Sequence, residues 1–83
     1  MTRSVFSPAY GRLREWLIEA RLARGVTQTE LAAQLGRQQS FVSKYERGER
    51  RLDFVEFLEI ADALQVDACD IVTDLRRPGA ESR

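Results

Sequence analysis

Three short segments of the sequence share one construction that fixes where helices begin. In each, a Thr or Asp is followed three residues later by Glu or Asp, and an apolar residue stands directly before and after this four-residue unit. The first residue is suited to cap a helix, the fourth can reach back to the cap, and the flanking apolar pair can form a hydrophobic staple. The units at 27–30, 53–56 and 67–70 therefore predict helices of about 8 to 12 residues that begin near 28, 54 and 68.

Two further helices are indicated by caps and glycines. Ser7 and Pro8 provide an N-cap and a proline at the first helical position, and apolar residues then recur on one face until Gly25. Gly36 and Gly48 can each take the left-handed conformation that ends a helix, and another helix fits between them. No alternating strand pattern is present, so we expect an all-α fold with five helices. Helical spacing assigns to the core Trp16, Phe54, Leu58, Ala61 and Leu64.

The helix predicted between these glycines, over about 38–47, has two different faces. At 100° per residue its polar side chains fall within roughly 140° of one another, and its apolar side chains lie opposite. One face is expected to pack on the preceding helix, while the other is available to a ligand. Because few residues join the two helices, they must cross steeply. The polar set is Gln39, Ser40, Ser43, Lys44 and Arg47, and the apolar set is Phe41, Val42 and Tyr45.

The charges are divided unevenly along the chain, although the formal net charge is zero. Residues 1–51 hold ten basic and five acidic side chains, giving 10 − 5 = +5, and residues 52–83 hold three and eight, giving 3 − 8 = −5. Such asymmetry indicates one face for a polyanion and another that repels it. An ordinary solvated charged surface is the alternative interpretation.

Composition argues against catalysis. Histidine is absent and Cys69 is the single cysteine, so the commonest general base and metal ligand are missing. We expect no enzyme activity, no metal or cofactor and no small-molecule ligand. No stretch approaches the roughly 18 apolar residues of a membrane span, and the N-terminus lacks signal-peptide features, so we expect no membrane segment and a cytoplasmic location. The expected organisation is an N-terminal arm (1–7), one domain (8–75) and a flexible tail (76–83).

The segment QTELAAQLGRQQSFVSKYER, from Gln28 to Arg47, resembles the helix-turn-helix of the lambda-repressor-like, Cro and XRE-type family of bacterial and phage regulators. That family has a small residue at the fifth position, glycine at the ninth and a branched apolar residue at the fifteenth, here Ala32, Gly36 and Val42. These residues allow close approach of the helices, an unstrained turn and a filled space between them. The resemblance extends from about Leu13 to Leu75.

The resemblance implies a partner, double-stranded DNA, with the third helix in the major groove and dimers on half-sites about one helical turn apart. It implies base reading by Gln39 and Ser40, with Ser43 and Lys44 one turn later. Glutamine can donate to and accept from adenine, and lysine can reach guanine or a phosphate. At the position of Gln28 the family implies a phosphate contact and often a bond that fixes the glutamine at position 39.

The same resemblance assigns roles to further charged residues. Arg21 is expected to pair with Glu46 as a structural ion pair. Arg37 and Gln38 depart from the family pattern, since an apolar or small residue and a capping Ser or Thr usually stand there; the arginine either packs its stem or points at phosphate. Phe41 either packs or touches a thymine methyl group. Phosphate contacts are expected of the arginines after the third helix, Arg47, Arg50 and Arg51, for which surface pairing with nearby glutamates is the alternative.

The acidic half contains more apolar side chains than one small core needs, which suggests a homodimer interface formed by Val55, Phe57, Val72 and Leu75. The expected function is that of a sequence-specific transcriptional regulator, most often a repressor in this family, bound to a palindromic operator. Three alternatives remain open: a protein-interaction module of the same fold, an antitoxin that represses its own operon, and a restriction-modification controller.

Overall fold

The computed structural model describes residues 7–77, and within that range the chain forms five α-helices and no strand. The predicted all-α class and the predicted helix starts at 28, 54 and 68 are confirmed. Of the expected arm (1–7) and tail (76–83), residues 1–6 and 78–83 lie outside the described residues, and α5 continues to Arg76. The helices are α1 (Pro8–Ala23), α2 (Gln28–Leu35), α3 (Gln39–Glu46), α4 (Phe54–Ala63) and α5 (Ala68–Arg76).

Side-chain caps fix the starts of α1, α2, α4 and α5. The Ser7 hydroxyl accepts a hydrogen bond from the N–H of Tyr10 at 3.1 Å, ahead of Pro8. Complete capping boxes open α2 and α4, as the sequence predicts. The start of α5 is simpler, because Asp67 accepts from the N–H of Cys69 at 2.8 Å and the predicted box with Asp70 does not form. The cap of α3 also differs, since Gln38 makes no side-chain bond to the helix.

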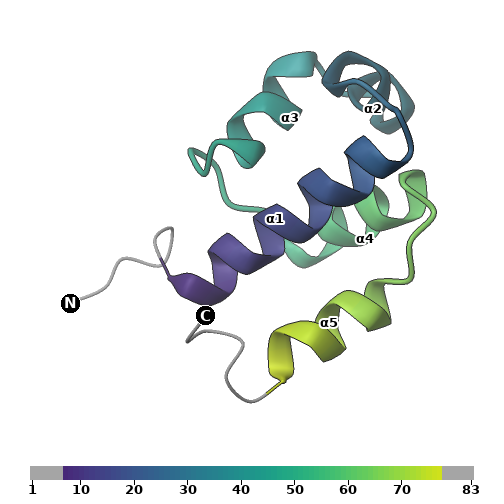
Figure 1. The fold of residues 1–83 in the computed structure, drawn as a ribbon. Coiled ribbons are helices and arrows are strands. Elements are labelled where there is room, and N and C mark those ends of the chain that lie inside the picture. The colour runs from purple at the N-terminus through teal and green to yellow at the C-terminus, as the bar shows by residue number, and fades with distance from the viewer. Residues whose placement is uncertain (1–6, 78–83) are drawn as a thin grey trace.

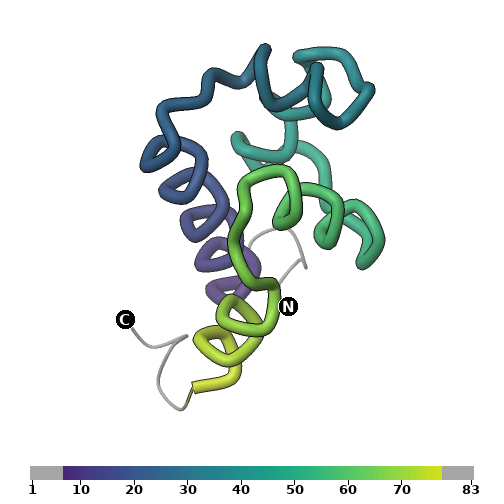
Figure 2. The backbone as a smooth tube through the Cα atoms, turned by 90° about the vertical axis from the view of Figure 1, so that its right-hand side faces the viewer, coloured from purple at the N-terminus to yellow at the C-terminus, as the bar shows by residue number. Residues whose placement is uncertain are grey.

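In Figure 1, α1 crosses the middle of the molecule, with α2 and α3 on one side of it and α5 on the other. Figure 2 shows the same arrangement from the side, with α4 between the helix-turn-helix and α5. All five helices contribute to one core. Its fully buried side chains of largest volume are Tyr45, Leu17, Leu31, Ile60, Leu64, Ile71 and Val42.

The turn between α2 and α3 has the predicted geometry. Gly36 has φ 70° and ψ 29°, and the N–H of Arg37 donates to the carbonyl of Ala32 at 2.9 Å, which closes the end of α2. Ala32 and Val42 are 2% and 0% exposed, so they fill the space between the crossing helices. This packing fixes α3 against α2 and leaves its opposite face outward.

Two predictions for α4 are wrong. Phe54, expected in the core, is 68% exposed, and Phe57, expected in a dimer interface, is 8% exposed and packs in the core. Apolar residues occur on several sides of α4, and tertiary packing decides which of them are buried. The rotation of the helix therefore places Phe57, together with Ile60, toward the interior.

Candidate nucleic-acid interface

The outward face of α3 carries the polar side chains predicted to read bases. Gln39, Ser40 and Lys44 are exposed, and Ser43 is half-buried. On the opposite side Val42 and Tyr45 are fully buried, as predicted, and Phe41 is half-buried. The exposed set thus forms one continuous face of a short, well-packed helix.

A chain of hydrogen bonds holds Gln39 in place. Its side-chain Nε2 donates to Oε1 of Gln28 at 2.7 Å, and Nε2 of Gln28 donates to Oε1 of Glu46 at 2.8 Å. The predicted bond between the two glutamines is therefore present. Glu46, the last acceptor in this series of hydrogen bonds, is 7% exposed and so is anchored in the interior. The orientation of Gln39 is therefore set by Gln28 at the start of α2 and by Glu46 at the end of α3.

The predicted ion pair between Arg21 and Glu46 is also present. Arg21 donates from Nε to Oε2 at 2.7 Å and from Nη2 to Oε1 at 3.1 Å, and its Nη1 donates to the carbonyl of Val26 at 2.9 Å. The two side chains are 11% and 6% exposed. The hydrogen bond to Glu46 raises the pKa of Arg21. This pair fastens α1 to the end of α3.

The loop between α3 and α4 is rich in arginines that pair with glutamates. Arg47 donates to both carboxylate oxygens of Glu49, at 2.9 and 3.0 Å, and also bonds the hydroxyl of Ser43. The hydrogen bond from Arg47 lowers the pKa of Glu49. Both partners are about half-exposed, so this pair is in contact with solvent.

A second, more buried glutamate binds two arginines. Arg50 donates to both oxygens of Glu56 at 2.8 Å, and Arg37 donates to Oε2 of the same carboxylate at 3.3 Å. The guanidinium groups of Arg37 and Arg50 lie 4.4 and 4.9 Å from the centre of the Phe41 ring. The hydrogen bond from Arg50 is the main reason that the pKa of Glu56 falls to about 2. Phe41 therefore packs within this cluster and against Tyr45, 5.6 Å away.

Residues of α1 that the sequence did not single out hold the same loop. The Tyr10 hydroxyl donates to the carbonyl of Arg50 at 3.1 Å, and Arg14 donates to the carbonyl of Glu46 from Nη2 at 2.6 Å and from Nε at 3.2 Å. Arg51 stacks over the Tyr10 ring at 4.1 Å. Gly48 has φ 81°, and a Cβ there would lie 3.2 Å from the Arg14 guanidinium. No local pattern signals these contacts, because they join residues 32 to 41 positions apart.

The residues proposed for a dimer interface differ in accessibility. Val55 and Val72 are 61% and 40% exposed, whereas Leu75 packs partly against the core and Phe57 belongs to it. Phe54, next to Val55, adds exposed apolar surface at the start of α4. Exposed apolar surface is therefore present on α4 and α5. It includes Phe54, which was not predicted, and excludes Phe57, which was.

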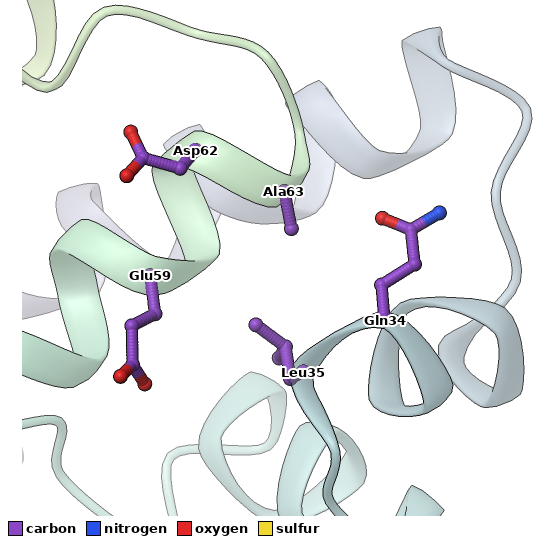
Figure 3. Close-up of a pocket in the computed structure, with 5 residues that line it drawn as sticks. All are labelled: Gln34, Leu35, Glu59, Asp62 and Ala63. Carbon is purple, nitrogen blue, oxygen red and sulfur yellow. The ribbon is translucent and has the colours of Figure 1, made fainter.

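An open groove lies between the end of α2 and the C-terminal half of α4 (Figure 3), where Leu35 and Ala63 point toward one another. Glu59 and Asp62 extend from the α4 side, and Gln34 from the α2 side. The two carboxylates repel an approaching phosphate, so this groove, unlike the outward face of α3, is unsuited to contact with DNA. Among residues 7–77, no three His, Cys, Asp or Glu side chains gather as a metal site requires.

Comparison with known proteins agrees with this geometry. A helix-turn-helix family model matches residues 17–71. A solved structure described as an XRE-family like protein from Pseudomonas syringae pv. tomato str. DC3000 is similar at 49% sequence identity and a TM-score of 0.78, over 81% of this chain and 82% of that one. A search of curated proteins gave no match. Within the described part of the chain, no helix is long and apolar enough to cross a membrane.

Proposed function

We propose that this chain, which belongs to the XRE-type helix-turn-helix family of DNA-binding regulators, represses transcription by binding a palindromic operator as a homodimer. In this proposal α3 enters the major groove and α2 crosses the DNA backbone, as in other helix-turn-helix proteins. A repressor of this kind acts by occupying its operator.

The observation that carries the proposal is the hydrogen-bond chain from Glu46 through Gln28 to Gln39. An amide side chain has two N–H donors and one carbonyl acceptor. Since Gln28 takes one N–H of Gln39, the other N–H and the carbonyl oxygen remain for N7 and N6 of adenine, the bidentate pairing that glutamine makes with that base. Holding the side chain before binding also reduces the entropy that is lost on contact.

The neighbouring side chains extend this readout. Ser40 is exposed beside Gln39, and its hydroxyl can donate or accept at a base edge. Lys44, one turn later, can reach guanine or a phosphate. Ser43 is bonded to Arg47, so we propose that it acts at the edge of the contact.

Phosphate contacts are proposed for Gln28 at the start of α2 and for the arginines that surround α3. The pairing found for Arg37, Arg47 and Arg50 means that a phosphate oxygen competes with a carboxylate oxygen for each guanidinium group. Arg51 adds positive charge in the same loop. These contacts position the protein on the duplex without specifying sequence.

The homodimer is proposed to form through exposed apolar side chains of α4 and α5, chiefly Val55 and Val72, with a contribution from the edge of Leu75. Two copies double the base readout and impose symmetry on the operator. Sedimentation at tens of micromolar tests this part. A dimer that Val55→Asp or Val72→Asp converts to a folded monomer supports it, and a wild-type monomer without cooperativity on DNA contradicts it.

The proposal as a whole is tested by titrating the protein against a randomised duplex library at two salt concentrations and sequencing the bound fraction. We expect enrichment of a palindrome with half-sites about ten base pairs apart and tighter binding at the lower salt concentration. Weak binding with no enriched sequence contradicts the proposal.

A further inference from the structure

We propose that Glu56 limits the affinity of the protein for the DNA backbone by occupying Arg37 and Arg50, the two arginines that stack on Phe41 of α3. This inference rests on the proposed function, because it concerns the same DNA-binding face. It assigns to an acidic residue of α4 control over how strongly DNA of any sequence is bound.

One carboxylate engages both guanidinium groups that are proposed to bind phosphate. Arg50 presents two parallel N–H groups to Glu56, both at 2.8 Å, which is the bidentate arrangement that arginine also makes with phosphate. Arg37 reaches the same carboxylate from the turn before α3 at 3.3 Å. The arginine side chains are 38% and 39% exposed, and Glu56 is 9% exposed, so the positive groups face outward and the carboxylate lies behind them.

The cluster is held from several directions. Glu56 is the third residue of α4, and its Oε1 accepts from the N–H of Asp53 at 3.0 Å, so the capping box fixes the carboxylate. Both guanidinium groups also stack on Phe41. An arginine that turns away toward phosphate must therefore give up a hydrogen bond and part of a cation–π contact together.

The consequence for DNA binding is electrostatic. Two arginines and one glutamate leave one net positive charge where the sequence predicts two phosphate contacts. Each phosphate that a protein neutralises steepens the fall of log affinity with log salt by about 0.9. A carboxylate next to the backbone is also a repulsive element, which lowers affinity for every duplex.

Arg47 and Glu49 provide the matched comparison in the same loop. Their hydrogen-bond distances are similar, but the two side chains are 55% and 54% exposed, and within residues 7–77 no aromatic ring stacks on Arg47. Exposed pairs of this kind contribute little and are easily exchanged. Removing the charge of Glu49 should therefore alter DNA binding less than removing that of Glu56.

Glu56→Gln is the informative variant, because glutamine can still accept the capping bond from Asp53 while its charge is lost. Binding of wild type, Glu56→Gln and Glu49→Gln to a random duplex and to the selected operator is measured by fluorescence anisotropy between 50 and 200 mM salt, alongside thermal melts. We expect Glu56→Gln to bind both duplexes more tightly and to steepen the salt slope by about 1 to 2. The ratio of its DNA affinity to that of wild type should rise roughly threefold to fourfold for each added phosphate contact when salt is lowered from 200 to 50 mM.

A folded Glu56→Gln protein with an unchanged slope, or with weaker binding to both duplexes, overturns the inference. If that variant does not fold, Arg37→Gln is compared with Arg47→Gln. Because Glu56 holds Arg37, losing Arg37 should reduce the slope of log affinity against log salt by less than the roughly 0.9 expected for losing Arg47, whose pair with Glu49 is easily broken. An equal loss of slope for Arg37→Gln and Arg47→Gln overturns the inference. A wild type that selects no operator contradicts the proposed function, whereas an unchanged Glu56→Gln slope in a protein that does select one contradicts this inference alone.

Discussion

Arg21 and Glu46 form a bidentate ion pair in which Nε and Nη2 of the arginine lie 2.7 and 3.1 Å from the two carboxylate oxygens. The same carboxylate accepts from Gln28 at 2.8 Å, so one buried charge joins α1, α2 and α3. Gln39, the exposed glutamine proposed to read bases, is the outer end of this network. The stability of the helix-turn-helix and the orientation of the Gln39 side chain therefore depend on one group, the Glu46 carboxylate.

Arg21→Ala should lower the free energy of unfolding by about 3 kcal/mol, because it leaves the Glu46 carboxylate buried without its cation. Thermal or denaturant melts measure this loss. Arg24→Ala is the control: Arg24 is exposed and its side chain donates a hydrogen bond to Gln65 at the surface, so its loss should change stability by less than about 0.5 kcal/mol. Unchanged stability of the Arg21 variant would show that the pair has no structural role.

Gln28→Ala should weaken operator binding and relax the preference at the base that Gln39 contacts, because Gln39 then loses the acceptor that orients it. Anisotropy titrations against the operator and against single-base variants of it provide the measurement. Gln34→Ala, at the groove on the other end of α2, should leave both quantities unchanged. Equal effects of the two substitutions would contradict the orienting role of Gln28.

Acidification should destabilise the protein through Glu56. The pKa of this carboxyl is lowered from its ordinary 4.5 to about 2 in the folded chain, chiefly by the hydrogen bond from Arg50. A depressed pKa contributes stability that is fully present above the unfolded value and is lost as pH falls from 4.5 toward 2. Melts between pH 6 and pH 2 should therefore show a smaller acid-induced loss in Glu56→Gln than in wild type. Parallel stability curves for the two proteins would contradict this assignment.

Tyr45→Phe should raise the free energy of unfolding by about 1 kcal/mol, because the buried Tyr45 hydroxyl has no hydrogen-bond partner in the described structure. Burial also raises the pKa of Tyr45, so the folded chain should lose stability above pH 10, where the unfolded tyrosine ionises. Tyr10→Phe is the opposite case. The Tyr10 hydroxyl donates a hydrogen bond to the carbonyl of Arg50, so removing that hydroxyl should lower the free energy of unfolding. A loss of stability in the Tyr45 variant would reveal a partner for its hydroxyl.

The helix boundaries could be predicted because their determinants are local. Thr27 with Glu30, Asp53 with its partner at position 56, and Gly36 each act within four residues of the helix end that they define. The ion pair of Arg21 with Glu46 was predicted from the family resemblance, which carries tertiary information that spacing alone lacks.

The side of α4 that is buried could not be predicted in the same way. Phe54, Val55 and Phe57 are all apolar, and the rotation of the helix about its axis is set by residues of α2 and α5 that pack against it. The exposed Phe54 and the buried Phe57 are the result. The pairing of Glu56 with Arg37 could not be predicted from local spacing, because Arg37 lies 19 positions earlier in the sequence.

Gln39, held by Gln28, is proposed to read the operator, and selection from one randomised duplex library with wild type and Gln39→Ala is the sharpest test of that role. Wild type should enrich a palindrome, and the variant should lose preference at one symmetry-related pair of positions, a loss of about 1 to 3 kcal/mol of discrimination per base pair. If both proteins enrich the same sequence with equal strictness at every position, Gln39 does not read the operator.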